Sequence, residues 1–174
     1  MSGKKNNMRQ LAFLSFFVVL GAQLGQMVYQ QRTDGATLEK RQEMLNEVRS
    51  GCRIVVEEEV KDAIVSGYVL PGGNQGVAVF EKEKKGYKLT STDEREQGRT
   101  VLATTYLDDE WYQLIWKNAE DLDYALVTYT EEDGETEELI LNAKDNRILY
   151  CEWPEADSFS MDVVFYTLDG EALE

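Results

Sequence analysis

From Ala63 to Leu168 hydrophobic and polar side chains alternate, a two-residue period that is typical of β-strands and argues against a helical domain here. Turn-forming pairs such as Asp133-Gly134 separate the alternating runs at roughly the 8–12-residue spacing of all-β folds. Connections this short leave no room for crossover helices, so neighbouring strands are expected to pair antiparallel. The predicted strands are 63–70, 76–83, 86–92, 99–106, 111–117, 123–130, 136–142, 146–153 and 160–168.

A helical pattern precedes the first strand, and it predicts one amphipathic helix over residues 37–62. Thr37 or Asp34 can cap this helix, because their side-chain oxygens accept hydrogen bonds from free backbone N–H groups. Its apolar stripe is expected to pack against the sheet or, alternatively, to pair with a second copy as a short coiled coil. The stripe consists of Leu38, Leu45, Val48, Cys52 and Val55.

These patterns predict an α+β fold that is mainly β with one N-terminal helix. The β domain is expected over residues 63–174, as an antiparallel meander that is curled or folded into a sandwich. In the chain, this domain is expected to follow a single transmembrane helix, which is predicted from the N-terminal residues.

Residues 1–33 contain four basic side chains and no acidic one, so the rest of the chain carries the other 14 basic and all 33 acidic side chains, a net charge of −19. Residues 11–29 are uncharged and largely apolar, and as a helix they would span about 28 Å, close to the thickness of a bilayer's hydrocarbon core. We therefore predict a transmembrane anchor in contact with the lipid bilayer at 11–29, between a cytoplasmic basic tail at 1–10 and a linker at 30–36. The positive-inside rule then places the bulk of the chain outside the cytoplasm.

Two alternatives for the apolar segment stay open at this point. A cleaved signal peptide has the same basic start and apolar centre, and its removal would give a secreted protein. Gly21 and Ala22 are the candidate cleavage positions, with Val19 and Leu20 two residues before them. A helix buried in a soluble domain is the other alternative.

The composition argues against several kinds of catalysis and ligand binding. The chain has no histidine, which excludes Ser-His-Asp and Cys-His catalysis and removes the usual zinc ligand. Its net charge of −15 opposes binding to phosphates, so nucleic acid is not an expected partner. The acidic clusters do not form a calcium loop: with Gly134 as the central glycine, Tyr129 and Ile140 occupy the first and last ligand positions. We therefore expect no catalytic residue, no cofactor, no metal site and no enzymatic activity.

Five residues are candidates for a special role. Cys52 and Cys151 either form a disulfide, as an exported domain permits, or are two reduced thiols buried as small apolar side chains. Trp111, Trp116 and Trp153 are candidate interaction aromatics, because an exposed aromatic strip can bind a partner protein or a glycan. The alternative for these rings is packing in the core and between neighbouring strands.

Four segments, 76–81, 86–89, 111–118 and 124–130, resemble small, uncharacterised membrane-anchored or exported proteins of Gram-positive Firmicutes. The resemblance covers residues 63–170 and implies a hydrophobic N-terminal segment followed by a short β-rich extracellular domain. It implies no particular activity.

A looser likeness is to type IV pilin-like subunits, which combine an apolar helix, an amphipathic helix, an antiparallel sheet and a late cysteine. The prepilin processing motif is absent, since Gly3 is followed by two lysines.

The expected function is therefore that of a non-enzymatic interaction module at the cell envelope: a single-pass, membrane-anchored, extracytoplasmic β domain that contacts a protein partner. The alternative is a pilin-like or pseudopilin-like structural subunit that assembles through its N-terminal helix.

Overall fold

The structure is a computed structural model, and it describes residues 34–154 and 158–173, with the side chain of Asn146 excepted. In these residues the chain is mainly antiparallel β with one α-helix, which confirms the predicted fold class at this level. The elements are α2 (Leu38–Val48), β1 (Arg53–Val60), β2 (Ala63–Val69), β3 (Gln75–Glu83), β4 (Gly86–Arg95), β5 (Val101–Leu107), β6 (Glu110–Trp116), β7 (Leu122–Glu131), β8 (Thr136–Asn142), the 3-10 turn η1 (Lys144–Asn146), β9 (Leu149–Glu152), β10 (Phe159–Thr167) and β11 (Ala172–Leu173).

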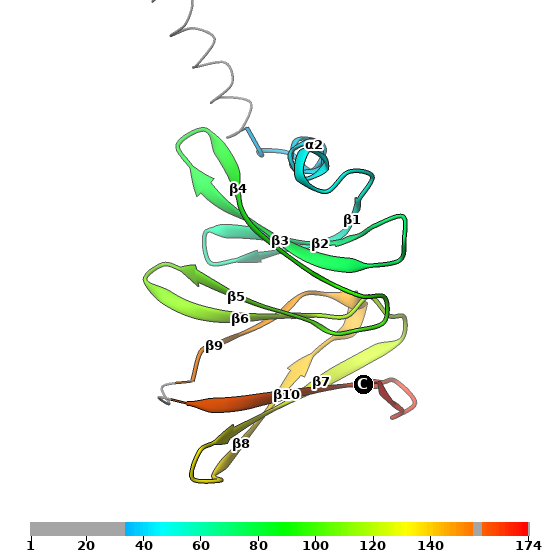
Figure 1. The fold of residues 1–174 in the computed structure, drawn as a ribbon, viewed down its shortest axis with the longest axis vertical. Helices are drawn as coiled ribbons and strands as arrows, with labels where there is room; N and C mark the ends of the chain where they lie inside the picture. Colours follow the sequence, from blue (N-terminus) through cyan, green and yellow to red (C-terminus); the bar gives the residue numbers. More distant parts are fainter. Residues whose placement is uncertain (1–33, 155–157, 174) are drawn as a thin grey trace, which may run out of the picture.

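The strands form three sheets that are stacked one on another, with α2 covering the outer face of the first (Figure 1). We call them the first sheet (β1-β2-β3-β4), the central sheet (β5-β6-β9) and the third sheet (β11-β10-β7-β8). All strand pairs are antiparallel. The first sheet is a simple meander, whereas β9 joins the central sheet after β7 and β8 have entered the third.

The stack of three sheets requires a strand that is apolar on both faces, and β6 provides it. Tyr112, Leu114 and Trp116 point toward the first sheet, and Ile115 points toward the third. All four side chains are fully or almost fully buried. A continuous hydrophobic run of this kind is the mark of a strand buried on both sides, and it explains why the domain has three layers.

The predicted helix over 37–62 is correct only in its first half. The helix begins after Thr37, whose hydroxyl accepts a hydrogen bond from the backbone N–H of Lys40, as the capping prediction requires. It ends at Val48, and Gly51 then turns the chain with a φ of 76°. Residues 53–60 form β1 instead, because the β-branched side chains there favour an extended strand paired with β2.

The predicted apolar stripe needs a similar correction. Leu45 and Cys52 are buried, but Leu38 and Val48 are exposed. The face of α2 that packs on the first sheet instead carries Arg41, Met44 and Leu45.

Arg41 is buried because an ion pair compensates its charge. Its Nε and Nη2 atoms donate to the two carboxylate oxygens of Glu57 in β1, over 2.8 and 2.6 Å. Ser66 in β2 donates to the same carboxylate over 2.7 Å, and Nη1 of Arg41 donates to the carbonyl of Gly35 over 2.8 Å. This bidentate pair fixes α2 on the outer face of the first sheet.

Within residues 34–154 and 158–173, no helix has both the length and the apolar character that crossing a bilayer requires. The basic tail predicted at 1–10, the anchor or signal segment predicted at 11–29 and the first part of the linker predicted at 30–36 lie outside the described residues. These three assignments stay predictions.

Candidate interaction site

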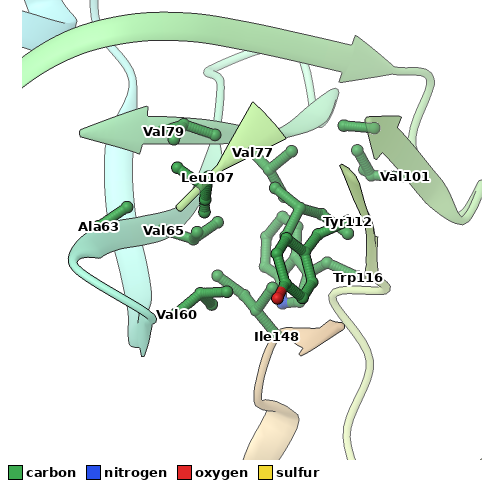
Figure 2. Close-up of a cluster of buried hydrophobic side chains, with 12 residues drawn as sticks. Val60, Ala63, Val65, Val77, Val79, Val101, Leu107, Tyr112, Trp116 and Ile148 are labelled. Carbon is green, nitrogen blue, oxygen red and sulfur yellow. The ribbon is translucent and has the colours of Figure 1, made fainter. Parts of the chain in front are cut away.

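The structure separates the three candidate tryptophans. Trp116 is fully buried between the first and central sheets, among the valines and Ile148 shown in Figure 2. It is therefore a core residue, and its prediction as an interaction aromatic is wrong. Trp111 and Trp153 are 54% and 39% exposed, and both lie at one end of the central sheet.

Trp111 and Trp153 belong to a row of three exposed rings on β5, β6 and the residue that follows β9. Tyr106 in β5 is paired with Trp111 in β6, and their ring centroids are 5.0 Å apart at an interplanar angle of 57°. On the other side, the backbone N–H of Trp153 donates to the carbonyl of Trp111 over 2.9 Å. Tyr106 is 49% exposed. We call Tyr106, Trp111 and Trp153 the aromatic row.

The aromatic row is anchored to the core through further rings. The Trp153 ring contacts Phe159, the first residue of β10, with centroids 4.9 Å apart at 68°. Phe159 in turn contacts Tyr129 of β7, with centroids 5.6 Å apart at 76°. The Tyr129 hydroxyl lies 2.9 Å from the sulfur of Cys151. These edge-to-face contacts hold one end of the row in place.

A groove of about 490 Å³ runs beside the aromatic row, between the central and third sheets. Its polar side chains are largely engaged with the protein. Gln113 donates to the carbonyl of Ala103 over 3.0 Å and accepts from the Thr104 hydroxyl over 3.4 Å. The groove is lined by Leu102, Thr104, Gln113, Trp153, Ser158, Phe159 and Met161.

Four exposed carboxylates lie near this end of the central sheet, and two of them, Asp108 and Asp109, are in the turn beside the aromatic row. The tight turn between β5 and β6 consists of Asp108 and Asp109, at φ values of 51° and 65°, a conformation that aspartate tolerates better than most residues. Glu110 is paired with Leu107 and Glu152 with Tyr112, so both side chains lie on the face of the central sheet opposite the aromatic row. Of these four acids only Glu110 forms an ion pair among the described residues, with Lys61 at 3.9 Å.

The candidate disulfide is absent, because the two cysteines lie in different layers. Cys52 packs between α2 and the first sheet, and Cys151 packs between the central and third sheets. Both are free and buried, and burial raises the pKa of each thiol. A raised pKa keeps a thiol protonated and unreactive. This outcome matches the alternative of two reduced core residues.

The sequence did not single out Tyr106 or Phe159 as site residues. Tyr106 could nevertheless have been predicted from the sequence. A two-residue turn at Asp108-Asp109 places it directly opposite Trp111 in an antiparallel hairpin. Phe159 gives no such local signal, since its contact with Trp153 joins two sheets.

Among residues 34–154 and 158–173, the structure holds no group of three or more acidic or cysteine side chains that could ligate a metal ion. The arrangement offers apolar ring surface and negative charge at one end of the stack.

Scans of protein-family models, curated proteins and solved structures each found no match to this chain. The resemblance to small Firmicute envelope proteins and the looser likeness to pilin-like subunits therefore stay predictions.

Proposed function

We propose that this chain is a non-enzymatic interaction module at the cell envelope, in which a membrane-anchored, extracytoplasmic β domain contacts a protein partner through its aromatic row. The observation that carries the proposal is the exposure of three large rings on neighbouring backbone segments at one end of the central sheet. The predicted anchor at 11–29 supports the location, and the absence of histidine from the sequence supports a role other than catalysis.

Ring chemistry supports a protein as the partner. Tryptophan and tyrosine are enriched in the energetically important centres of protein interfaces, because a large rigid ring buries much area with few rotatable bonds. The contact between Tyr106 and Trp111 already restricts both side chains, which lowers the entropy that binding would cost. An exposed apolar patch with a polar rim is the usual form of such a site.

Site-specific photo-crosslinking in intact envelopes tests the proposal. The full-length chain carries a benzophenone amino acid at position 111 or 153, and a matched chain carries it at Ile140, an exposed residue of β8 in the third sheet. We expect one discrete product with a second protein at 111 and 153, and none at 140. Equal products at all three positions, or no product at 111 and 153, would contradict the proposal.

Two other outcomes also count against it. A ladder of the chain cross-linked to itself would favour the pilin-like structural subunit. Turnover of a peptide, glycan or phosphoester by the purified full-length chain, lost on substitution of one acidic residue, would establish an enzyme.

A further inference from the structure

We infer that the aromatic row binds a cationic side chain, lysine or arginine, on a basic segment of the partner. This inference rests on the proposed function and specifies the chemistry of the partner at that site. The faces of tryptophan and tyrosine rings are electron-rich, so they attract an ammonium or guanidinium group that approaches within about 6 Å of the ring centre. Trp111 and Tyr106 are each about half exposed, so their rings are accessible to such a group.

The charge around the row favours a cation. Asp108 and Asp109 are exposed and make no ion pair within the described residues. Asp108 and Asp109 occupy the turn that joins the two strands carrying Tyr106 and Trp111. A basic segment on the row would therefore bring its charge to carboxylates that lack a partner, and an acidic segment would be repelled.

The chain itself combines a cation, a tyrosine ring and a carboxylate at two other places. On the opposite face of β6, the Lys61 ammonium lies 5.4 Å from the centre of the Tyr112 ring and 3.9 Å from the Glu110 carboxylate. Beneath α2, the Arg41 guanidinium lies 5.9 Å from the centre of the Tyr87 ring while it pairs with Glu57. Both cations thus lie beside a tyrosine ring and a carboxylate, and the aromatic row presents the same two groups without the cation.

A glycan fits the same observations less well. Saccharide sites combine a ring with polar side chains that read the sugar hydroxyls, but the side chains of Gln113 and Thr104 in the adjacent groove bond to each other and to the backbone. The 57° angle between Tyr106 and Trp111 also makes a corner instead of a flat platform. A corner suits a compact charged group.

The test uses the full-length chain in detergent and three probes: a dodecapeptide of alternating lysine and serine, its glutamine-serine counterpart, and chitohexaose. Binding is followed by tryptophan fluorescence and by calorimetry. We expect the lysine peptide alone to bind. Replacing both rings, with Tyr106→Leu and Trp111→Leu, is expected to weaken its affinity about tenfold, the size of a lost cation–π contact.

A pair of charge variants separates a specific site from general attraction to an acidic protein. Asp108→Asn with Asp109→Asn removes two charges at the row, and asparagine tolerates the positive φ of this turn. Glu132→Gln with Glu135→Gln removes two charges from the exposed hairpin between β7 and β8. We expect the first pair to weaken binding of the lysine peptide about fivefold and the second pair to leave it within twofold.

Equal losses in the two charge variants, or an unchanged affinity after both rings are replaced, would overturn the inference. Equal binding of the glutamine peptide, or binding of chitohexaose in place of the lysine peptide, would overturn it as well. Its failure is distinguishable from failure of the proposed function, because a discrete cross-link from position 111 would still establish a partner of different chemistry.

Discussion

The two faces of the central sheet are formed by the same strands, but the neighbouring sheets bury them to different extents. On the face toward the first sheet, the buried cluster runs along the whole of β5 and β6, from Val101 and Trp116 at one end to Leu107 and Tyr112 at the other. On the face toward the third sheet, burial continues from Ile115 to the level of Cys151 and then stops. Beyond that level the rings of the aromatic row are in solvent.

The difference arises from the third sheet, whose strand β10 starts at Phe159 and so covers only part of the central sheet. Figure 1 shows the turn between β5 and β6 and the start of β10 at the same side of the stack. Two tryptophans of one strand therefore differ completely: Trp116 is in the core, and Trp111 is not. Core packing accounts for Trp116, and the proposed function assigns Trp111 to a contact with a partner.

The largest expected effect that tests this comparison comes from Trp116→Ala. The substitution empties a fully buried site between the first and central sheets, and we expect the free energy of unfolding to fall by about 3–5 kcal/mol. Urea denaturation followed by circular dichroism measures the change. If the free energy of unfolding falls by less than about 1 kcal/mol, Trp116 is not tightly packed between the first and central sheets.

A glycine next to this ring gives the second test. A methyl group added at Gly67 in β2 would lie 2.7 Å from Cε2 of Trp116 and 2.8 Å from Cγ1 of Val56. We therefore expect Gly67→Ala to destabilise the protein by about 1–3 kcal/mol through overpacking. Gly72→Ala is the matched control, since nothing lies within 4 Å of the added group there. Similar urea midpoints for the two variants would contradict tight packing against Trp116.

The sequence predicted the strands well because their two-residue alternation and their turns are local signals. It extended the helix too far for a specific reason: the apolar spacing from Leu45 through Cys52 to Val55 continues across the turn at Gly51, although the chain changes from helix to strand there. The cluster of β-branched residues at 54–56 favours a strand, but the predicted helix extended through it to residue 62, and the structure shows β1 there instead.

The site was predictable only in part. Alternation along β6 places Trp111 and Trp116 on opposite faces of the strand, but it does not say which face is covered at each position. That depends on how far the third sheet extends, and its strands come from residues 122–173, beyond β6 in the chain. The burial of Arg41 was also missed, because its partner Glu57 belongs to a strand that was predicted as helix.

Alkaline pH is expected to weaken the interface between the central and third sheets. Burial raises the pKa of both Tyr129 and Cys151 above their ordinary values. The unfolded state, with pKa values of about 10 and 8.5, then loses these protons first, so stability is complete below about pH 8 and falls as pH rises. Tyr129→Phe removes one of the two groups. It should reduce the loss of unfolding free energy between pH 8 and pH 11 by about 1 kcal/mol.

Urea denaturation at several pH values measures this fall. Tyr150→Phe, which removes the hydroxyl of an exposed tyrosine in β9, is the matched control. Equal slopes for the two variants would show that the Tyr129 hydroxyl does not couple this interface to pH.

The smallest expected effect on stability belongs to Trp111, the ring that the proposed function assigns to binding. Trp111 is 54% exposed, and its only ring contact among the described residues is with Tyr106, so Trp111→Ala should change the free energy of unfolding by no more than about 1 kcal/mol. The same substitution should abolish the cross-link formed from position 153 in intact envelopes. A variant that unfolds as readily as Trp116→Ala would show that both faces of the central sheet serve stability, and that the open end of the stack needs no partner to explain it.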